Sequence, residues 1–284
     1  MRRELHEANR LSWNAATPAH NSHKGDQAAF FRAGGSTLKP EEVELLGDLA
    51  GQTLVHLQCN AGQDTLSLAR LGARVTGVDI SDEAIEFARR LSAESVVPAE
   101  FERADVYDWL ERAAAGGRRF DAAFSSYGAV CWLTDLGAWA RGVAGILAPG
   151  GRFVLMEFHP VASMYEPDMT LRFPYSTGGR PSEWDQGVGD YVAESGLGLA
   201  LGEHHEGVKD FHNPHRAYDF QWGVAEVVQA LIDAGLVIEG LREYLFSNGY
   251  QPFRGMREEP GRRFRTPVGV PDLPLMYSVV ARRP

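Results

Sequence analysis

The chain alternates short apolar runs with segments whose apolar residues recur at helical spacing. The runs expected to form strands are Thr53 to Leu57, Arg74 to Asp79, Ala99 to Arg103, Phe120 to Ser125 and Gly151 to Phe158. The segments expected to form helices between them are Asp64 to Leu71, Asp82 to Ala93, Val106 to Ala114 and Asp135 to Leu147. Because strands that alternate with helices form parallel sheets covered on both faces, the pattern predicts a doubly wound α/β fold.

Before this region, the pattern predicts a short helix from Glu4 to Trp13 and a polar stretch as far as Pro40, where a helix begins. After Pro160, residues 161–217 are rich in glycine, proline and aromatic residues. Short strands are expected there near Leu171–Tyr175 and Asp190–Glu194. Loops of this length in a compact domain are usually functional, so the insertion is interpreted as a lid or as the wall of a pocket.

The pattern resumes after the insertion with an apolar stripe from Val224 to Ala234, which predicts another helix. Two further strand-like runs follow it, Leu236 to Phe246 and Leu275 to Ala281. The expected sheet is therefore mostly parallel and seven-stranded, with helices on both faces.

Composition narrows the class of protein. The 284 residues are 44% hydrophobic and 23% charged, as in an ordinary water-soluble domain with an insertion. The net charge of −10 works against a polyanionic partner, so nucleic acid is not expected. The N-terminus lacks the apolar core of a signal peptide, and no apolar run approaches the roughly 20 residues that span a bilayer. With two cysteines, Cys59 and Cys131, the chain is expected in the reducing cytoplasm and away from membranes.

The most informative stretch runs from residue 53 to residue 81. A buried strand leads into a tight turn at Gln58 to Gly62, and a helix follows at once. The unpaired backbone N–H groups and positive end of such a helix can hold a carboxylate or a phosphate. The next strand ends in Asp79, which is expected to face the crevice outside the strand ends, where a carboxylate can bind both hydroxyls of a ribose.

This stretch, TLVHLQCNAGQDTLSLARLGARVTGVDIS, resembles motifs I and II of the class I S-adenosylmethionine-dependent methyltransferases, in particular a subgroup of uncharacterised bacterial members. That family usually has an acid in the first strand and then a GxGxG turn. Here His56 replaces the acid, Gln58 and Asn60 replace two glycines, and Gly62 remains. The segments Ala104-Asp105-Val106, Ser125-Ser126-Tyr127 and LAPGGRFVLMEFH follow one strand–helix unit apart, and they extend the resemblance over nearly the whole chain.

The resemblance implies a Rossmann-like fold with an N-terminal helical lid, and S-adenosyl-L-methionine as the cofactor. It divides the chain into a lid segment (1–39), a cofactor-binding core (40–160), an insertion after the fifth strand (161–217), and a C-terminal helix with the last two strands (218–284). Asp79 would bind the ribose, Asp105 and Val106 the adenine, and the turn at residues 58–62 the methionine tail. The expected cofactor-binding residues are Trp13, His56, Gln58, Asn60, Gly62, Asp79, Ile80, Ala104, Asp105, Val106 and Ser125.

Several of these residues also have a purely structural interpretation. Asp79 could cap the following helix, although Ser81 suits that position equally well, and Asp105 could cap the next helix. His56 lies within an apolar run and could be a hydrogen-bonded histidine of the core. The four histidines His204, His205, His212 and His215 match no compact ligand spacing, so no metal is expected.

A sulfonium methyl is already activated, so its transfer depends mainly on alignment and on the exclusion of water. A general base is needed only if the acceptor arrives protonated. His159, which follows the fifth strand, and Tyr127, which follows the fourth, are the candidate catalytic residues. The alternative for His159 is that His159-Pro160 simply ends the strand.

The sequence thus predicts methyl transfer to an oxygen or nitrogen of a small, partly apolar molecule, and it leaves self-association into a homodimer open. One alternative is a non-catalytic protein that binds S-adenosylmethionine or S-adenosylhomocysteine. An RNA methyltransferase is another. A nicotinamide-dependent oxidoreductase is a third, but such enzymes usually need GxGxxG, and Gln58 and Asn60 would obstruct the pyrophosphate.

Overall fold

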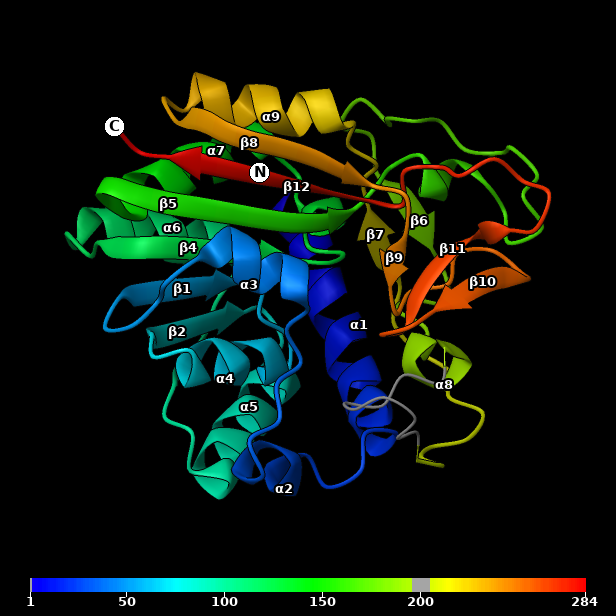
Figure 1. The fold of residues 1–284 in the computed structure, drawn as a ribbon, viewed down its shortest axis with the longest axis horizontal. Helices are drawn as coiled ribbons and strands as arrows, with labels where there is room; N and C mark the ends of the chain where they lie inside the picture. Colours follow the sequence, from blue (N-terminus) through cyan, green and yellow to red (C-terminus); the bar gives the residue numbers. More distant parts are fainter. Residues whose placement is uncertain (1, 196–204) are drawn as a thin grey trace.

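The computed structural model describes residues 2–195 and 205–284. Its centre is a seven-stranded sheet in the order β3-β2-β1-β4-β5-β12-β8 (Figure 1). These strands are β1 (Thr53–Leu57), β2 (Arg74–Asp79), β3 (Glu100–Arg103), β4 (Phe120–Ser126), β5 (Leu147–Phe158), β8 (Val237–Tyr244) and β12 (Met276–Arg282). The first five are parallel, whereas β12 runs antiparallel to both β5 and β8. The predicted fold class and the number of strands are confirmed.

Helices cover both faces of this sheet. On one face, α6 (Val106–Ala115), α7 (Leu136–Ile146) and α9 (Val224–Asp233) bury Trp109, Trp139 and Leu231 in a shared core. On the other face lie α3 (Pro40–Leu46), α4 (Gln63–Arg70) and α5 (Asp82–Ser95). Each predicted helix of the alternating region is present, with ends shifted by two residues at most. The parallel strands therefore place the ends of β1, β2 and β4 at one edge, where loops can form a site.

The first helix is longer than its pattern suggests. Helix α1 spans Arg3–Ser22, nine residues beyond the predicted end at Trp13, and it crosses in front of the strand ends (Figure 1). Its second half buries Ala16 against Val188 and Ala217 of the insertion, and the buried His20 contacts the Gly189 carbonyl. The short helix α2 (Gln27–Arg32) follows and packs against α5. Contacts with distant parts of the chain, which a local pattern does not contain, stabilise this extension.

Both strands predicted in the insertion were wrong. Near Leu171–Tyr175 there is a single bridge, between Tyr165 and Leu171. At Asp190–Glu194 the chain forms helix α8 (Tyr191–Ser195), because Asp190 caps it by accepting a hydrogen bond from the Ala193 N–H. The strands in this region are β6 (Ser182–Trp184) and β7 (Ala217–Asp219), which pair with each other. Two short 3₁₀ turns, η1 (Val130–Trp132) and η2 (Ala162–Met164), complete the loops after β4 and β5.

A small antiparallel sheet between β8 and β12 was not predicted. It consists of β9 (Ser247–Asn248), β10 (Met256–Glu259) and β11 (Arg263–Pro267). Its strands are short and rich in arginine, so they lack the apolar alternation that marks a strand. Strand β9 brings Asn248 towards the end of β4.

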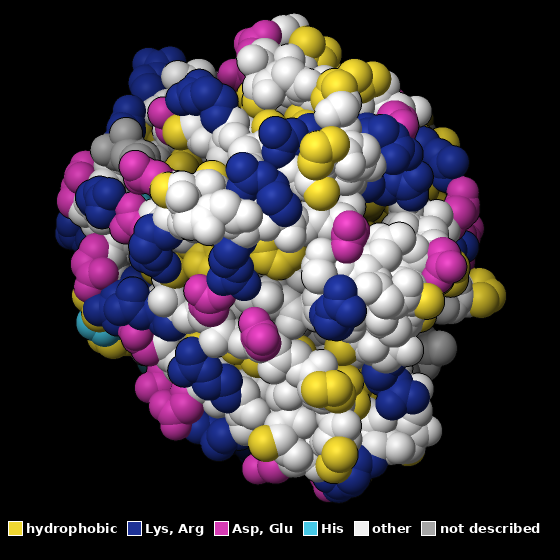
Figure 2. Space-filling view, turned by 90° about the vertical axis from the view of Figure 1, so that its left-hand side faces the viewer, with side chains coloured by type: hydrophobic (Ala, Val, Ile, Leu, Met, Phe, Trp, Pro, Cys, Tyr) yellow, Lys and Arg dark blue, Asp and Glu magenta, His cyan; other side chains and the backbone are white. Residues whose placement is uncertain are grey.

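The surface at the left of Figure 1 carries basic and acidic side chains interspersed with each other (Figure 2). That face therefore lacks the continuous basic surface that tracks a phosphate backbone. Within the described ranges, no helix has the length and apolar character needed to cross a bilayer.

Candidate functional site

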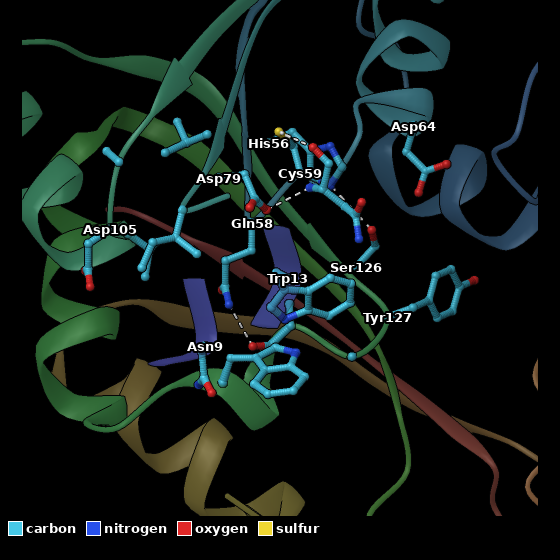
Figure 3. Close-up of a pocket in the computed structure, with 18 of the residues that line it drawn as sticks. Asn9, Trp13, His56, Gln58, Cys59, Asp64, Asp79, Asp105, Ser126 and Tyr127 are labelled. Carbon is cyan, nitrogen blue, oxygen red and sulfur yellow. Dashed lines mark hydrogen bonds between the residues drawn. The ribbon is translucent and has the colours of Figure 1, made fainter. Parts of the chain in front are cut away.

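A cavity of about 310 Å³ lies at the C-terminal ends of β1, β2 and β4, beneath α1. Nine of the eleven residues predicted to bind the cofactor line it, all except Gly62 and Ser125. Figure 3 shows Asp105 near one end of this cavity, Asp64 and Tyr127 near the other, and Gln58 and Asp79 between them. The cavity is therefore elongated, and its polar side chains are spread along its length.

The turn after β1 has the backbone geometry that glycines would give it. Gln58, Asn60 and Gly62 have positive φ values of 56°, 49° and 83°. Positive φ is unfavourable for residues with a side chain, and asparagine tolerates it better than most. Asn60 also stabilises its own conformation, because its Oδ1 accepts a hydrogen bond from the Ala61 N–H at 2.6 Å. The glycine-rich turn has thus kept its shape while losing two of its glycines.

The side chain of Gln58 and the packing around Gly62 also shape the turn. Gln58 donates through Nε2 to the Ala129 carbonyl at 2.8 Å, and its buried Oε1 has no hydrogen-bond partner among the described residues. Gly62 does not face the cavity. A Cβ there would lie 2.7 Å from the Ala88 Cβ and 2.8 Å from the Phe101 ring, so glycine permits the close packing of α4 on α5 and β3.

Asp79 ends β2 and faces the cavity. Its Oδ2 accepts a hydrogen bond from the Asn60 N–H at 2.8 Å, and its Oδ1 accepts one from the Ser81 N–H at 2.9 Å. Burial raises the pKa of Asp79, and these backbone donors oppose that shift. The cap of α5 is Ser81, whose Oγ accepts a hydrogen bond from the Ala84 N–H. Asp79 is therefore available to bind a ligand, and its position fixes the turn.

Asp105 has a different environment. It caps α6 by accepting a hydrogen bond from the Tyr107 N–H, and its Oδ2 lies 2.6 Å from the His6 Nδ1 of α1. Burial raises the pKa of Asp105, but the contacts with His6 and the backbone N–H groups of Tyr107 and Asp108 together lower the pKa overall. Asp105 also lines the cavity beside Ala104 and Val106. The carboxylate thus caps a helix, contacts the cavity and ties α1 to the rest of the domain.

His56 has the environment of a core histidine. Its Nδ1 lies 2.9 Å from the Thr65 Oγ1 and its Nε2 lies 3.4 Å from the Ser126 Oγ. Burial lowers its pKa to about 4, so the ring is neutral at physiological pH. Ser125 is fully buried and does not line the cavity, whereas Ser126 does. Adjacent residues of a strand point to opposite faces, which explains this difference.

The two candidate catalytic residues lie in different places. Tyr127 lines the cavity, and its hydroxyl accepts a hydrogen bond from the Asn248 Nδ2 at 2.9 Å. Burial, with a contribution from the nearby Glu42, raises the pKa of Tyr127 well above its ordinary value, so the hydroxyl stays protonated. His159 is not among the cavity-lining residues. Its Nε2 contacts the Glu243 Oε1 at 2.9 Å, and its Nδ1 accepts a hydrogen bond from the Val161 N–H.

Sequence reasoning missed the polar side chains of α1 and α4 that face the cavity. His6 and Asn9 of α1 line it together with Trp13, which was predicted, and the spacing of three and four residues is that of one helix face, a signal that was present in the sequence. Lys24 lines it from the segment after α1, and Asp64 lines it from the first turn of α4. No local pattern identifies these two residues.

Glu157, near the end of β5, was also missed. Its buried carboxylate accepts hydrogen bonds from the backbone N–H groups of Gly128, Ala129, Val130 and Phe158. This fixes the loop after β4, and Ala129 of that loop in turn holds Gln58. No group of three or more metal-ligating side chains occurs in residues 2–195 and 205–284, and His204 lies outside these described residues.

Comparisons with known proteins agree with this geometry. A family model described as a methyltransferase domain matches residues 55–151. The chain is similar to the ubiquinone biosynthesis O-methyltransferase of Methylobacterium sp. (strain 4-46), with 32% identity over 149 residues, which are 50% of this chain and 55% of that protein. It is 34% identical over 130 residues to an S-adenosyl-L-methionine-dependent Diels-Alderase of Talaromyces variabilis, covering 43% of this chain and 42% of that one.

Among solved structures, the fold is similar to that of an S-adenosylmethionine-dependent methyltransferase from Mesorhizobium loti. The TM-score is 0.54 at 22% sequence identity, over 88% of this chain and 99% of the other. The match to the two curated relatives above spans about half of each one's length.

Proposed function

Since the chain belongs to the class I S-adenosylmethionine-dependent methyltransferase family, we propose that it transfers the methyl group of this cofactor to an oxygen or nitrogen of a small, partly apolar molecule. The observation that carries the proposal is Asp79, held at the floor of the cavity by the N–H groups of Asn60 and Ser81. A carboxylate in this position, beside a turn at the end of the first strand, suits an adenosyl ribose.

The residues present fit the cofactor. The cavity is elongated, like an adenosyl group with an amino-acid tail, and the buried Gln58 Oε1 lacks a donor among the described residues. Asp79 would accept hydrogen bonds from the ribose hydroxyls. Ile80, Ala104, Asp105 and Val106 would surround the adenine, and the turn at residues 58–62 would lie along the tail. When bound, the cofactor supplies an activated sulfonium methyl.

The protein's contribution to the reaction is alignment and exclusion of water. Trp13, Trp132 and Tyr191 are close to one another, with the Trp13 ring centre 5.6 Å from that of Trp132 and 6.4 Å from that of Tyr191. These rings would shield the methyl group and present an apolar surface to the acceptor. Tyr127 would act as a hydrogen-bond donor, since its raised pKa makes it a poor base. His159 has no part in this proposal.

A second candidate function is cofactor binding without methyl transfer. The name of one relative describes a cofactor-dependent Diels-Alderase, and two of the family's three glycines are replaced here. Two experiments separate the candidates. Stabilisation against heat by S-adenosylhomocysteine but not by NAD would identify the nucleoside class. Transfer of label from methyl-labelled S-adenosylmethionine to a panel of phenols, carboxylic acids and amines would then identify a methyltransferase. Binding of the cofactor without any transfer would favour the second candidate.

A further inference from the structure

Two opposite charges line the end of the cavity farthest from Asp105 (Figure 3). Lys24 comes from the segment after α1, and Asp64 comes from the first turn of α4. Figure 3 shows Asp64 well separated from Asp105, with Asp79 and Gln58 between them. A ligand that places its ribose on Asp79 and its base near Asp105 would therefore extend its other end towards Asp64 and Lys24.

Lys24 is a half-buried cation without a counterion in contact. It is one of three lysines in the chain, and within the described residues its ammonium has no hydrogen bond or ion pair. Burial lowers the pKa of Lys24 to about 8, although the more distant Asp64 and Asp190 oppose this shift. A desolvated ammonium is costly unless an anion pairs with it, so this position favours an anionic ligand.

The negative charge at this end of the cavity is that of Asp64, and oxygen atoms without a hydrogen-bond donor among the described residues lie along the same cavity. Asp64 accepts a hydrogen bond from the Thr37 hydroxyl through Oδ1, and in the described part of the chain its Oδ2 has no partner. The buried Gln58 Oε1, along the same cavity, is also without a donor there. These oxygens favour a ligand group with several N–H donors, such as an ammonium.

The end of α1 is fixed against α4, so the two charges are held near each other. Gln63, beside Asp64, donates through Nε2 to the Asn21 Oδ1 at 3.0 Å and to the Gln27 Oε1 at 2.9 Å. Asn21 and Gln27 flank Lys24 in the sequence. This network gives the cavity end a defined separation between its cation and its acceptors.

From this arrangement we propose that Lys24 and Asp64 together recognise a zwitterion, the amino-acid end of the adenosyl cofactor. Lys24 binds the α-carboxylate, and Asp64 with the Gln58 Oε1 binds the α-ammonium. The proposal rests on the proposed function. In this proposal, Lys24 and Asp64, which both lie outside the 58–62 turn, allow the site to distinguish a ligand with an intact amino-acid tail. Lys24 belongs to the segment that covers the cavity.

Calorimetric titration of the full chain with three probes tests this. S-adenosylhomocysteine has both charged groups, decarboxylated S-adenosylhomocysteine keeps the ammonium alone, and 5′-methylthioadenosine lacks both. For Lys24→Met we expect about 10- to 100-fold weaker binding of S-adenosylhomocysteine, because a charge-assisted hydrogen bond is lost. Affinity for the other two probes should stay within about twofold. Lys209→Met is the matched control, since Lys209 is exposed and pairs with Glu206 on the surface.

The Asp64→Asn variant has a different expected pattern. Removing the negative charge should weaken S-adenosylhomocysteine and its decarboxylated form by about 5- to 50-fold each, and leave 5′-methylthioadenosine unchanged. The side chain keeps its size, and the oxygen of the new amide could still accept the Thr37 hydrogen bond, so the fold should be preserved. Thermal unfolding of each variant checks this.

The pH dependence gives a readout in the unmodified protein. The charged or titratable groups that act on Lys24 are Asp64 from α4, Asp190 before α8, and His20 of α1, whose pKa burial lowers to about 4. Lys24 is fully protonated only well below pH 8, so its contribution to S-adenosylhomocysteine affinity should be greatest there and be lost as the pH rises through 8. Relative to the wild-type protein, Lys24→Met should lack this component.

Two results would overturn the proposal while leaving the proposed function intact. One is unchanged S-adenosylhomocysteine affinity in Lys24→Met, which would assign Lys24 to an anionic acceptor or to packing. The other is an equal loss for all three probes, which would indicate a distorted cavity. If the wild-type protein bound none of the three probes, the proposed function would fail together with this inference.

Discussion

One wall of the cavity comes from a single stretch of chain, residues 53–106, whereas the opposite side combines α1 with distant segments. In the first wall, the Asp79 carboxylate joins the 58–62 turn to Ser81 by accepting hydrogen bonds from the Asn60 and Ser81 N–H groups. The second, which we call the cover, consists of α1 and residues 187–191 and 217–219. There Val188 N–H donates to the Ser12 Oγ across 176 residues, and the Asn9 side chain bonds the backbone of Tyr218 across 209.

The difference in construction implies a difference in role. The contiguous wall is built on strands of the central sheet and the turns that follow them, although His6 and Asn21 of α1 contact it at Asp105 and Gln63. The cover is held by side chains of α1 and its C-terminal cap, including His20, which contacts the Gly189 carbonyl, and His23, which contacts the Asp190 carboxylate. Removing the Asp79 carboxylate from the wall should therefore weaken cofactor binding more than removing a side chain from the cover.

The largest effect is expected at Asp79. Asp79→Ala removes the proposed acceptor for two ribose hydroxyls and also the acceptor that holds the Asn60 and Ser81 N–H groups. We expect S-adenosylhomocysteine affinity to fall by at least 100-fold, or about 3 kcal/mol, in calorimetry. Asp168→Ala, at an exposed acid of the insertion, is the control and should bind normally. Full affinity in Asp79→Ala would remove the ribose assignment.

The next effect concerns Glu42, a buried carboxyl of α3 near Tyr127. Burial and the charge of Asp64 raise its pKa to about 8. The folded protein therefore holds a proton there that the unfolded chain releases above about pH 4.5. Its contribution to stability is complete below that pH and is lost as the pH rises through 8. Glu42→Gln should remove this dependence and be more stable than wild type at pH 8 by roughly 3 kcal/mol.

Chemical denaturation at pH 5 and pH 8 measures this difference. Glu44→Gln is the control, because Glu44 lies on the same helix, is exposed and pairs with Arg242. It should change stability by less than about 1 kcal/mol at either pH. Parallel stability curves for wild type and Glu42→Gln would show that Glu42 is ionised in the folded state.

A smaller effect is expected in the cover. Trp13→Ala removes the ring that contacts Trp132, His20 and Tyr191, and it opens the cavity to water. We expect about tenfold weaker S-adenosylhomocysteine binding, equivalent to about 1.4 kcal/mol. Trp184→Ala, at an exposed tryptophan of β6, is the matched control. An effect as large as that of Asp79→Ala would contradict the division between wall and cover.

The contiguous wall is also what the sequence predicts best. Strands β1 and β2 begin and end at the expected residues, and Asp79 lies in the cavity as expected. All of this follows from local patterns, namely apolar runs, a turn and the acid that ends a strand. The replacement of two glycines by Gln58 and Asn60 does not change the turn, since both residues adopt the positive φ that it requires.

The remaining parts of the site depend on contacts between distant segments. Glu42 has the pattern of an acid in a first helical turn, and it does accept a hydrogen bond from the Lys39 N–H. Its burial comes from tertiary packing, which the pattern does not contain. Asn248 reaches Tyr127 from a strand 121 residues away. Asp190 caps helix α8, and this capping residue was a local signal for a helix that the prediction of a strand did not take into account.

The smallest effect is expected for Asn60→Gly, which restores a family glycine. Glycine relieves the positive φ of 49°, but the hydrogen bond from the Ala61 N–H to the Asn60 side chain is lost. These terms oppose each other, so the free energy of unfolding should change by less than about 1 kcal/mol. S-adenosylhomocysteine affinity should stay within about threefold. A much larger loss would show that the Asn60 side chain itself binds the ligand.

The central claim is that the cavity beneath α1 binds an adenosyl cofactor along its length. A crystal structure of the protein with S-adenosylhomocysteine tests this most directly. We expect the ribose hydroxyls within hydrogen-bonding distance of the Asp79 carboxylate, the adenine beside Ile80 and Val106, and the tail against residues 58–60. A ligand bound elsewhere, or a cavity without ligand at saturating concentration, would contradict the account.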